Sequence, residues 1–290
     1  MRPADAAARG SPEGLRYVRS GETMFDPILL SAHNPSPMTG EGNNTYLLAG
    51  RGQPAVLIDA GVGEPAHVEA IAAALRERDA HLGLVLVTHG HRDHAGGAPV
   101  LAAAHPAAAF AKHPWPEEDH RYAVSWQTIG EGGLVTADRE PLAVLHTPGH
   151  SPDHLAVWHE PTRTLFTGDL VVRGSSVMIH SSRGGNLAQY LASLERLLSL
   201  DPVRLLPAHG PAIDDPRAVI SGYISHRLFR ERQVESALRA GRATVEAIAE
   251  SIYDGLSPAL MAAAQENVRA HLEKLRSEGR AFEADGRWQT

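Results

Sequence analysis

The chain has 290 residues, of which 43% are hydrophobic and none is cysteine, and its formal net charge is −7. This length and composition allow one large domain and a smaller one around a buried core, and they exclude disulfides and thiolate metal ligands. The acidic balance argues against tight binding of duplex nucleic acid, because that binding depends on positive charge.

The first residues, 1–20, are rich in alanine and arginine, and we expect a flexible tail there. They lack the apolar stretch of a signal peptide. The apolar runs elsewhere are much shorter than the ~20 residues that a membrane-spanning helix needs. The sequence therefore predicts a cytoplasmic protein that makes no membrane contact.

Residues 21–220 alternate between short apolar runs of strand type and alanine-rich stretches with helical spacing. Strands are expected at residues 45–48, 55–58, 84–87, 142–145, 155–158, 164–166 and 203–206. Helices are expected at residues 65–78, 96–104 and 187–200. The polar segment 115–131 fits either a flap over a site or a solvated loop. This alternation indicates a mixed α/β domain.

Helical spacing dominates from about residue 221 onward. Two helices are expected at residues 244–253 and 257–277, and the second opens with a Ser-Pro pair that suits a helix N-terminus. An Asp-Gly pair near the end of the chain is typical of a β-hairpin turn. Helix, helix and hairpin form the outline of a winged helix, so we predict a small C-terminal domain over residues 221–290.

The most specific signal is the segment 88–94, Thr-His-Gly-His-Arg-Asp-His, which directly follows the predicted strand at 84–87. It offers the nitrogen and oxygen ligands that zinc accepts when sulfur is absent, and Gly90 permits the tight turn that would aim them at one point. A solvated loop that is rich in histidine is the alternative interpretation. The candidate ligands in this segment are His89, His91, Asp93 and His94.

Three more side chains of ligand type each lie just beyond a predicted strand, namely His150, Asp169 and His209. Loops at the ends of strands are common places for sites. We therefore expect these side chains to meet the 88–94 segment at one edge of a sheet sandwich. His154, four residues after His150, is assigned no role.

The segment 88–94 and the turns that carry the other three ligands, Thr-Pro-Gly-His, Thr-Gly-Asp and Pro-Ala-His-Gly, resemble the metallo-β-lactamase superfamily. The resemblance covers residues 43–211. It implies an αββα sandwich that holds two metal ions at one edge, with the small winged-helix-like domain appended.

The same resemblance implies which ligand belongs to which ion, and it implies two divalent cations as cofactors, with zinc in first place and iron or manganese as alternatives. One ion would be held by His89, His91 and His150. The other would be held by Asp93, His94 and His209, with Asp169 bridging the two.

Two positions differ from the residues found in other branches of the superfamily, and they narrow the choice of activity. His91 stands where flavodiiron proteins have glutamate, which argues against oxygen reduction at a di-iron site. Asp169 stands where the lactamases of the superfamily usually have cysteine or serine, which argues against antibiotic hydrolysis. A bridging aspartate is typical of glyoxalase II-like thioesterases and of the nucleases.

The chain is more closely similar to the beta-lactamase-like protein 2 family, through residues 43–46, 223–227 and 230–233 and through the winged-helix-like tail. The better-known members are endoribonucleases that act on single-stranded RNA, and related bacterial chains resemble thioesterases that act on carrier-bound polyketides. The implied partners are thus a small-molecule or carrier-bound acyl substrate, or single-stranded RNA. The tail interleaves acidic and basic residues, which favours a packing or lid element over a phosphate-binding surface.

The implied reaction is hydrolysis of a thioester or related acyl ester by a hydroxide held between the two metals, with Asp93 orienting the attacking water. Endoribonuclease activity at the same site and a mononuclear iron dioxygenase are the alternatives. Asp59 either orients a ligand histidine or caps a turn. His226 and Arg227 either bind an anionic group of the substrate or serve packing and solvation.

Overall fold

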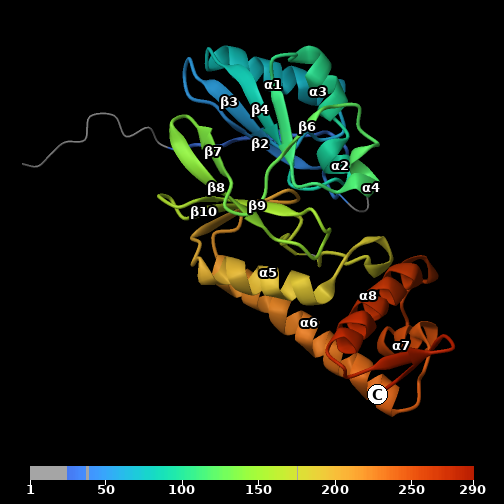
Figure 1. Cartoon of the computed structure of the whole chain (residues 1–290). Helices are drawn as coiled ribbons and strands as arrows, with labels where there is room; N and C mark the ends of the chain where they lie inside the picture. Colours follow the sequence, from blue (N-terminus) through green and yellow to red (C-terminus); the bar gives the residue numbers. More distant parts are fainter. Residues whose placement is uncertain (1–24, 37–38, 175) are drawn as a thin grey trace, which may run out of the picture.

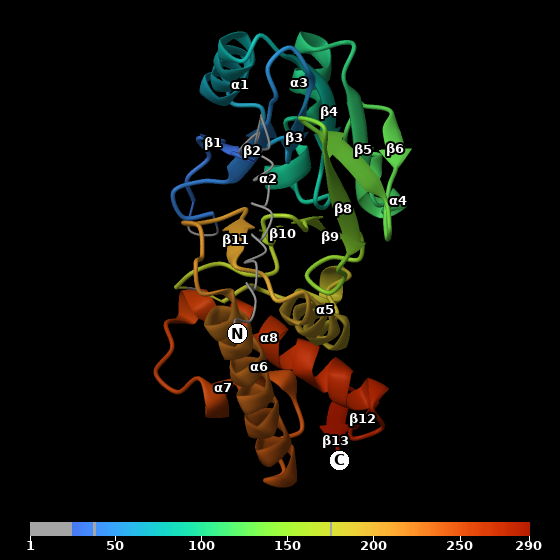
Figure 2. The ribbon, with the colours of Figure 1, turned by 90° about the vertical axis from the view of Figure 1, so that its left-hand side faces the viewer.

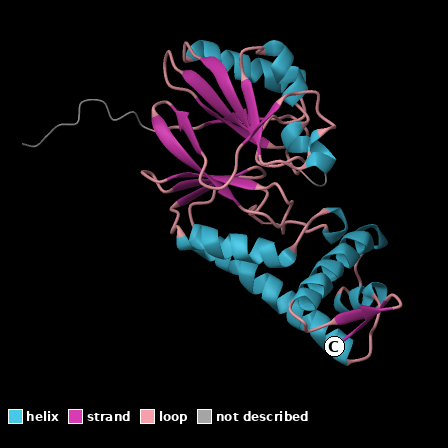
Figure 3. Ribbon diagram, viewed as in Figure 1, coloured by secondary structure: helices cyan, strands magenta, loops and turns pink. Residues whose placement is uncertain are grey.

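Two β-sheets pack face to face in the computed structural model, with helices on both outer faces (Figure 1 and Figure 3). The structure describes residues 25–36, 39–174 and 176–290, so the predicted tail over residues 1–20 lies outside the described residues. The first sheet has the strand order β1 (Ile28–Ser31), β2 (Asn44–Leu48), β3 (Pro54–Ile58), β4 (His81–Leu86), β5 (Ala109–Lys112) and β6 (Trp126–Thr128). The second has the order β11 (Arg204–Pro207), β10 (Thr164–Gly168), β9 (Leu155–His159), β8 (Glu140–His146) and β7 (Leu134–Ala137).

The helices form the two outer layers of the sandwich (Figure 2). The first sheet is covered by α1 (Pro65–Glu77) and α3 (Ala98–Ala104), and the second by α5 (Leu187–Ser199) and α6 (Pro216–Arg239). Shorter helices lie in loops, namely α2 (Arg92–Ala95), α4 (Pro116–Asp119) and the 3-10 turn η1 (Ser181–Arg183). No helix among the described residues is long and apolar enough to cross a membrane. The αββα layering expected from the sequence is confirmed.

Alternation along the strands builds two separate cores on the first sheet. On β3, Leu57 packs toward α1 and α3, whereas Val56 and Ile58 face the second sheet and meet Phe166 of β10 there. Side chains on a strand point alternately to opposite faces, and a sheet that is buried on both faces therefore carries continuous apolar runs. This is why the strand at 55–58 shows no polar alternation in the sequence.

The carboxyl ends of five strands lie at one edge of the sandwich. Strands β3 and β4 are parallel, as are β10 and β11, and β8 runs in the direction of β10 because both are antiparallel to β9. Two backbone hydrogen bonds join the sheets at this edge, from the Asn44 N–H to the Ala208 oxygen (2.7 Å) and from the Leu155 N–H to the Thr88 oxygen (2.7 Å). The loops that follow these strands are thereby brought together.

The C-terminal unit consists of two helices and a hairpin, as the sequence predicts. It comprises α7 (Val245–Ile252), α8 (Pro258–Ser277), β12 (Phe282–Ala284) and β13 (Arg287–Gln289). The side chain of Thr244 caps α7 by accepting from the Ala247 N–H (3.2 Å). Trp288 of the hairpin is buried against both helices and against the end of α6, so the unit has its own small core.

Helix α6 is shared by the sandwich and the C-terminal unit. It begins at Pro216 and crosses the predicted boundary at residues 220 and 221 without a break. Ile220, near its start, packs in the core under the second sheet, and Leu238, near its end, packs in the core of the C-terminal unit. The division of the chain at this boundary stays a prediction, and the structure links the two parts by a helix instead of a flexible linker.

The polar segment 115–131 is more regular than the sequence suggests. It contains α4 and the edge strand β6, which pairs in parallel with β5. Residues of α4 nevertheless line the large pocket that is described below. The segment is therefore part sheet edge and part pocket wall.

The ring of His271 on α8 is fully buried, and neither ring nitrogen has a hydrogen-bond partner within the described part of the chain. Burial, together with the charges of Arg227 and Arg230, lowers the pKa of His271 to about 3. In an unfolded chain this group titrates near ~6.5. Between these two values the unfolded state binds more protons than the folded state, so stability falls as the pH falls.

We therefore expect His271→Leu to flatten the pH dependence of stability in this window, by up to about 1.4 kcal/mol per pH unit. Urea unfolding at pH values from about 7 to about 4 measures the slope. His81→Leu, at an exposed position that begins β4, is the control and should keep the wild-type slope. An unchanged slope in His271→Leu would contradict the prediction.

Candidate metal centre

The structure brings all seven predicted ligands together at the strand-end edge, in two groups. Within each group, one nitrogen or oxygen atom of every member lies within 4.8 Å of the others. The first group is His89, His91 and His150, and the second is Asp93, His94, Asp169 and His209.

The three imidazoles of the first group point their nitrogens at one place. The Nδ1 atom of His91 lies 2.9 Å from Nε2 of His89 and 3.0 Å from Nε2 of His150. Burial, and then the neighbouring His150, lowers the pKa of His91 to about 3. Burial followed by the neighbouring imidazoles also holds the pKa of His89 well below its usual range. The rings are therefore neutral, which is the form that binds metal.

The second ring nitrogen is hydrogen-bonded to the protein in three of the candidate ligand histidines, two from the first group and one from the second. His150 donates from Nδ1 to the Met178 oxygen (3.0 Å), His94 donates from Nδ1 to Asp59 (2.8 Å), and Nδ1 of His89 lies 3.1 Å from the Thr88 hydroxyl. Such contacts fix the tautomer and the orientation of a ligand histidine. In each case the Nε2 atom is the one left facing the group.

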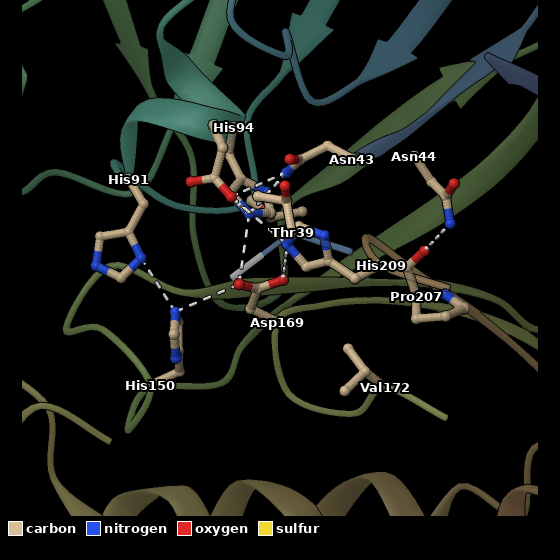
Figure 4. A network of polar contacts seen from close by, with 12 residues as sticks. Thr39, Asn43, Asn44, His91, His94, His150, Asp169, Val172, Pro207 and His209 are labelled. Carbon is tan, nitrogen blue, oxygen red and sulfur yellow. Dashed lines mark hydrogen bonds and ion pairs between the residues drawn. The ribbon is translucent and has the colours of Figure 1, made fainter. Parts of the chain in front are cut away.

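Asp169 is the member of the second group that also faces His150 of the first, as Figure 4 shows. Its Oδ2 atom is 3.6 Å from Nε2 of His150 and 3.5 Å from Nε2 of His94, and its Oδ1 atom is 3.3 Å from Nε2 of His209. Burial raises the pKa of this carboxyl, but His94 and the hydrogen bond from His209 outweigh it and hold the pKa well below its usual range. Asp169 is therefore ionised and can face two cations at once.

The donor set suits two divalent cations. Imidazole nitrogens and carboxylate oxygens, without sulfur, are ligands that zinc accepts, and iron or manganese also accepts them. The two carboxylates, Asp93 and Asp169, also supply negative charge that offsets part of the charge of two divalent cations. The residues present thus fit the metals that the sequence analysis expects.

The comparisons with known proteins agree with this geometry. A model of the metallo-beta-lactamase superfamily matches residues 38–209, which is more than half of the chain. The chain belongs to this superfamily. A model of the beta-lactamase associated winged helix domain matches residues 244–288, which confirms the predicted nature of the C-terminal unit.

Curated relatives and solved structures add detail. A beta-lactamase-like protein 2 homolog from Drosophila melanogaster is 30% identical over 85% of this chain and 86% of its own length. An atrochrysone carboxyl ACP thioesterase from Aspergillus chevalieri is 33% identical over 78% of this chain and 72% of its own length. The crystal structure of a metallo-beta-lactamase family protein from Thermus thermophilus matches with a TM-score of 0.73 at 22% identity, covering 91% of this chain and 98% of that one. The resemblance drawn from the sequence is confirmed, and the protein is a hydrolase of this superfamily.

Asp59 lies directly behind His94 of the metallo-beta-lactamase site. Its Oδ2 atom accepts from the His94 ring (2.8 Å) and from the Thr88 hydroxyl (3.0 Å), and its Oδ1 atom accepts from the Thr88 N–H (2.7 Å). Its backbone is in the left-handed region, with φ of 65°, which aspartate and asparagine adopt more readily than most residues. The same residue thus makes the turn and contacts a candidate ligand histidine.

Two residues beside the centre were not assigned a role in it from the sequence. The buried ring of His154 accepts at Nε2 from the Asp169 N–H (3.0 Å), and its Nδ1 atom lies 2.9 Å from the Thr147 hydroxyl. The side chain of Asn43 donates to Oδ2 of Asp93 (3.2 Å). The position of His154 four residues after His150 was the available signal, and the Asn-Asn-Thr-Tyr run at 43–46 was used only for the family resemblance.

The structure does not bring His226 and Arg227 to the site. Arg227 is 1% exposed, and its guanidinium donates to the Asn267 side chain (2.8 Å) and to the Val177 backbone oxygen. His226 is exposed on the outside of α6. Arg227 therefore supports the pocket wall from behind, and the expected contact with an anionic substrate group is not formed by either residue.

A pocket of about 2220 Å³ opens over the centre. Asp93, Asp169 and His209 lie in its floor, and Trp115 and Met178 contribute to its apolar walls. Leu260 of α8 also lines it, so the C-terminal unit forms one side. Three arginines line the pocket without an ion pair to any described carboxylate, namely Arg92, Arg173 and Arg183.

The contact between Asp59 and His94 can be tested by Asp59→Asn, which keeps the turn but removes the charge that supports the ring. We expect metal affinity to fall by about 10- to 100-fold, measured by competition with a chromophoric chelator. Asp79→Asn, at an exposed turn that also has positive φ, is the matched control. Equal affinity in wild type and Asp59→Asn would show that Asp59 only caps its turn.

Proposed function

We propose that this hydrolase cleaves a thioester or related acyl ester at a site with two metal ions. In the proposal His89, His91 and His150 hold one ion, and Asp93, His94 and His209 hold the other. The observation that carries it is the position of Asp169, whose carboxylate faces His150 on one side and His209 on the other. A carboxylate with one oxygen toward each side can serve two ions, whereas a single ion would use only one of these sides.

Two bound divalent cations, with zinc in first place and iron or manganese as alternatives, would supply a water of lowered pKa and polarise the substrate carbonyl. The chain's own groups do the positioning. Asp93 is held ionised, because the nearby His94 and the hydrogen bond from His209 outweigh burial and lower the pKa of its carboxyl. The Asn43 amide donates to Oδ2 of Asp93, which helps to fix how the carboxylate faces the site. In the proposal the ionised carboxylate of Asp93 orients the attacking water.

The size and walls of the pocket support a large, partly apolar substrate. Sites for drug-sized ligands usually enclose about 300–1,000 Å³, and this pocket is larger. Leu260 of α8 lines it, and the Ser182 hydroxyl donates to Glu266 of α8 (3.0 Å). Both contacts support a role for the C-terminal unit as a lid. A carrier-bound acyl group is a substrate of suitable size, and the relative named as an acyl carrier protein thioesterase supports this class.

Cleavage of single-stranded RNA is the second candidate, and the three unpaired arginines of the pocket favour it, because guanidinium binds phosphate well. They suit the phosphate of a carrier arm equally well. The tail gives RNA no comparable support, because the positive charges of Arg276 and Arg280 are paired with Glu273 and Glu231. A mononuclear iron dioxygenase is disfavoured, because His94 and His209 complete a second group of ligands.

One zinc-loaded preparation of the full chain can separate these activities. It is assayed on an acyl-coenzyme A, on an acylated carrier protein and on fluorescent single-stranded RNA, and its metal is counted by elemental analysis. We expect about two zinc ions per chain and thioester turnover. Asp93→Ala should reduce turnover by roughly 100-fold or more, because it removes the group that orients water. Asp214→Ala, at an exposed aspartate outside the pocket, should behave as wild type.

RNA cleavage that is lost in Asp93→Ala, without thioester turnover, would replace the proposal by the ribonuclease. One bound iron and neither hydrolytic activity would overturn both hydrolase assignments and favour the dioxygenase.

Removing a ligand of the first group tests the metal assignment itself. His91→Ala should lower the bound metal from about two ions to about one and abolish turnover, because His91 has the nitrogen shared by both contacts within that group. His120→Ala, at an exposed histidine, is the control. Full activity with unchanged metal content in His91→Ala would refute the assignment.

A further inference from the structure

Gly90 lies between the candidate ligands His89 and His91, and both of its backbone polar groups are hydrogen-bonded to side chains. Its N–H donates to Oδ2 of Asp153 (2.7 Å), and its carbonyl accepts from the Tyr122 hydroxyl (2.8 Å). The space around it is filled, since a β-carbon added at Gly90 would lie 3.2 Å from Cβ of Glu118 and 3.3 Å from Asp153. Movement of this peptide would move both neighbouring histidines.

Asp153 is itself held by a buried lysine. The Lys112 ammonium lies 3.0 Å from Oδ2 of Asp153 and 2.5 Å from Oδ1 of Asp119, and it donates to the His113 backbone oxygen (2.7 Å). All three ammonium protons thus have an acceptor. The side chains of Lys112 and Asp153 are both 0% exposed, and buried charges of this kind are stable only when they are paired and hydrogen-bonded.

The same lysine is linked to Trp115 of the pocket wall by Asp119, which contacts both residues. The second oxygen of Asp119 accepts from the Trp115 N–H (2.9 Å). The Trp115 ring lines the pocket and has its centre 6.2 Å from that of His91. The cluster of Lys112, Asp119 and Asp153 therefore contacts both the loop that carries the candidate ligands, residues 88–94, and the pocket wall at Trp115.

We propose that Asp153 and Lys112 are positioning residues of the metal centre, which act through the Gly90 peptide to fix His89 and His91 and through Asp119 to fix Trp115. This inference rests on the metal site of the proposed function. The positioning role does not depend on which substrate is cleaved, because Asp153 and Lys112 act on the geometry of the candidate metal ligands.

A second buried lysine provides a matched comparison. Lys274 of α8 also lies between two carboxylates, 2.7 Å from Glu231 and 2.6 Å from Glu278, and its side chain is 9% exposed. It belongs to the C-terminal unit, and its ion pairs are with residues of that unit and of α6, not with the segment 88–94. Its replacement should therefore cost stability in a similar way without changing the metal centre.

The test compares Asp153→Asn and Lys112→Met with Lys274→Met in the full chain. Zinc affinity is measured by chelator competition, ligand geometry by the absorption spectrum of the cobalt-substituted protein, and stability by urea unfolding of the metal-free protein. We expect zinc affinity to fall by about 10- to 100-fold in the first two variants, with an altered cobalt spectrum. Lys274→Met should retain both wild-type properties even where its stability falls as much.

Tyr122→Phe keeps the test decisive if a buried-charge variant does not fold, since it removes only the hydroxyl that binds the Gly90 carbonyl. We expect a smaller loss of zinc affinity in the same direction. Wild-type affinity and cobalt spectrum in every folded variant of Asp153, Lys112 and Tyr122 would overturn the inference. Two tightly bound zinc ions in a wild-type protein without thioester turnover would refute the proposed substrate while leaving this test valid.

Discussion

The ionised carboxylate of Asp169 is partly buried among the imidazole rings of His94, His150 and His209, and neighbouring loops hold it there. Its N–H donates to His154, whose ring is anchored in turn to Thr147, so the end of β10 is fixed to the loop between β8 and β9. Gly168 just before it has a positive φ, and a β-carbon there would lie 2.6 Å from the His154 ring. A side chain at position 168 would therefore push the ring away from the peptide that it holds.

The meeting of the candidate ligands at one edge could be predicted, because the position of each depends on local sequence. His150, Asp169 and His209 each follow an apolar strand at short distance, and the strand directions place those ends at one edge. The layered fold and the helix–helix–hairpin tail could also be predicted, since apolar spacing and turn residues indicate local structure. In these parts of the chain, the elements that local sequence patterns predict are the elements that the tertiary structure contains.

Apart from Asp59, the residues that support the site could not be predicted, because their partners are distant in the sequence. Arg227 appeared suited to bind an anion, but its guanidinium bonds to Val177 and Asn267, which lie 50 and 40 residues away. Lys112 is an ordinary strand residue until the fold brings Asp153 within 3.0 Å of it. Charged residues on a strand or helix usually face solvent, so a buried charge can be recognised only when its counter-charge has been placed.

The unbroken course of α6 makes the length of that helix a determinant of pocket shape. Arg227 ties its middle to the sandwich and to α8, and its last turns carry the unit whose Leu260 closes one side of the pocket. One residue added to the stretch beyond Arg227 would turn that unit by about 100° and shift it by about 1.5 Å. A change in the length of this stretch would therefore alter the shape of the pocket while every candidate metal ligand stays in place.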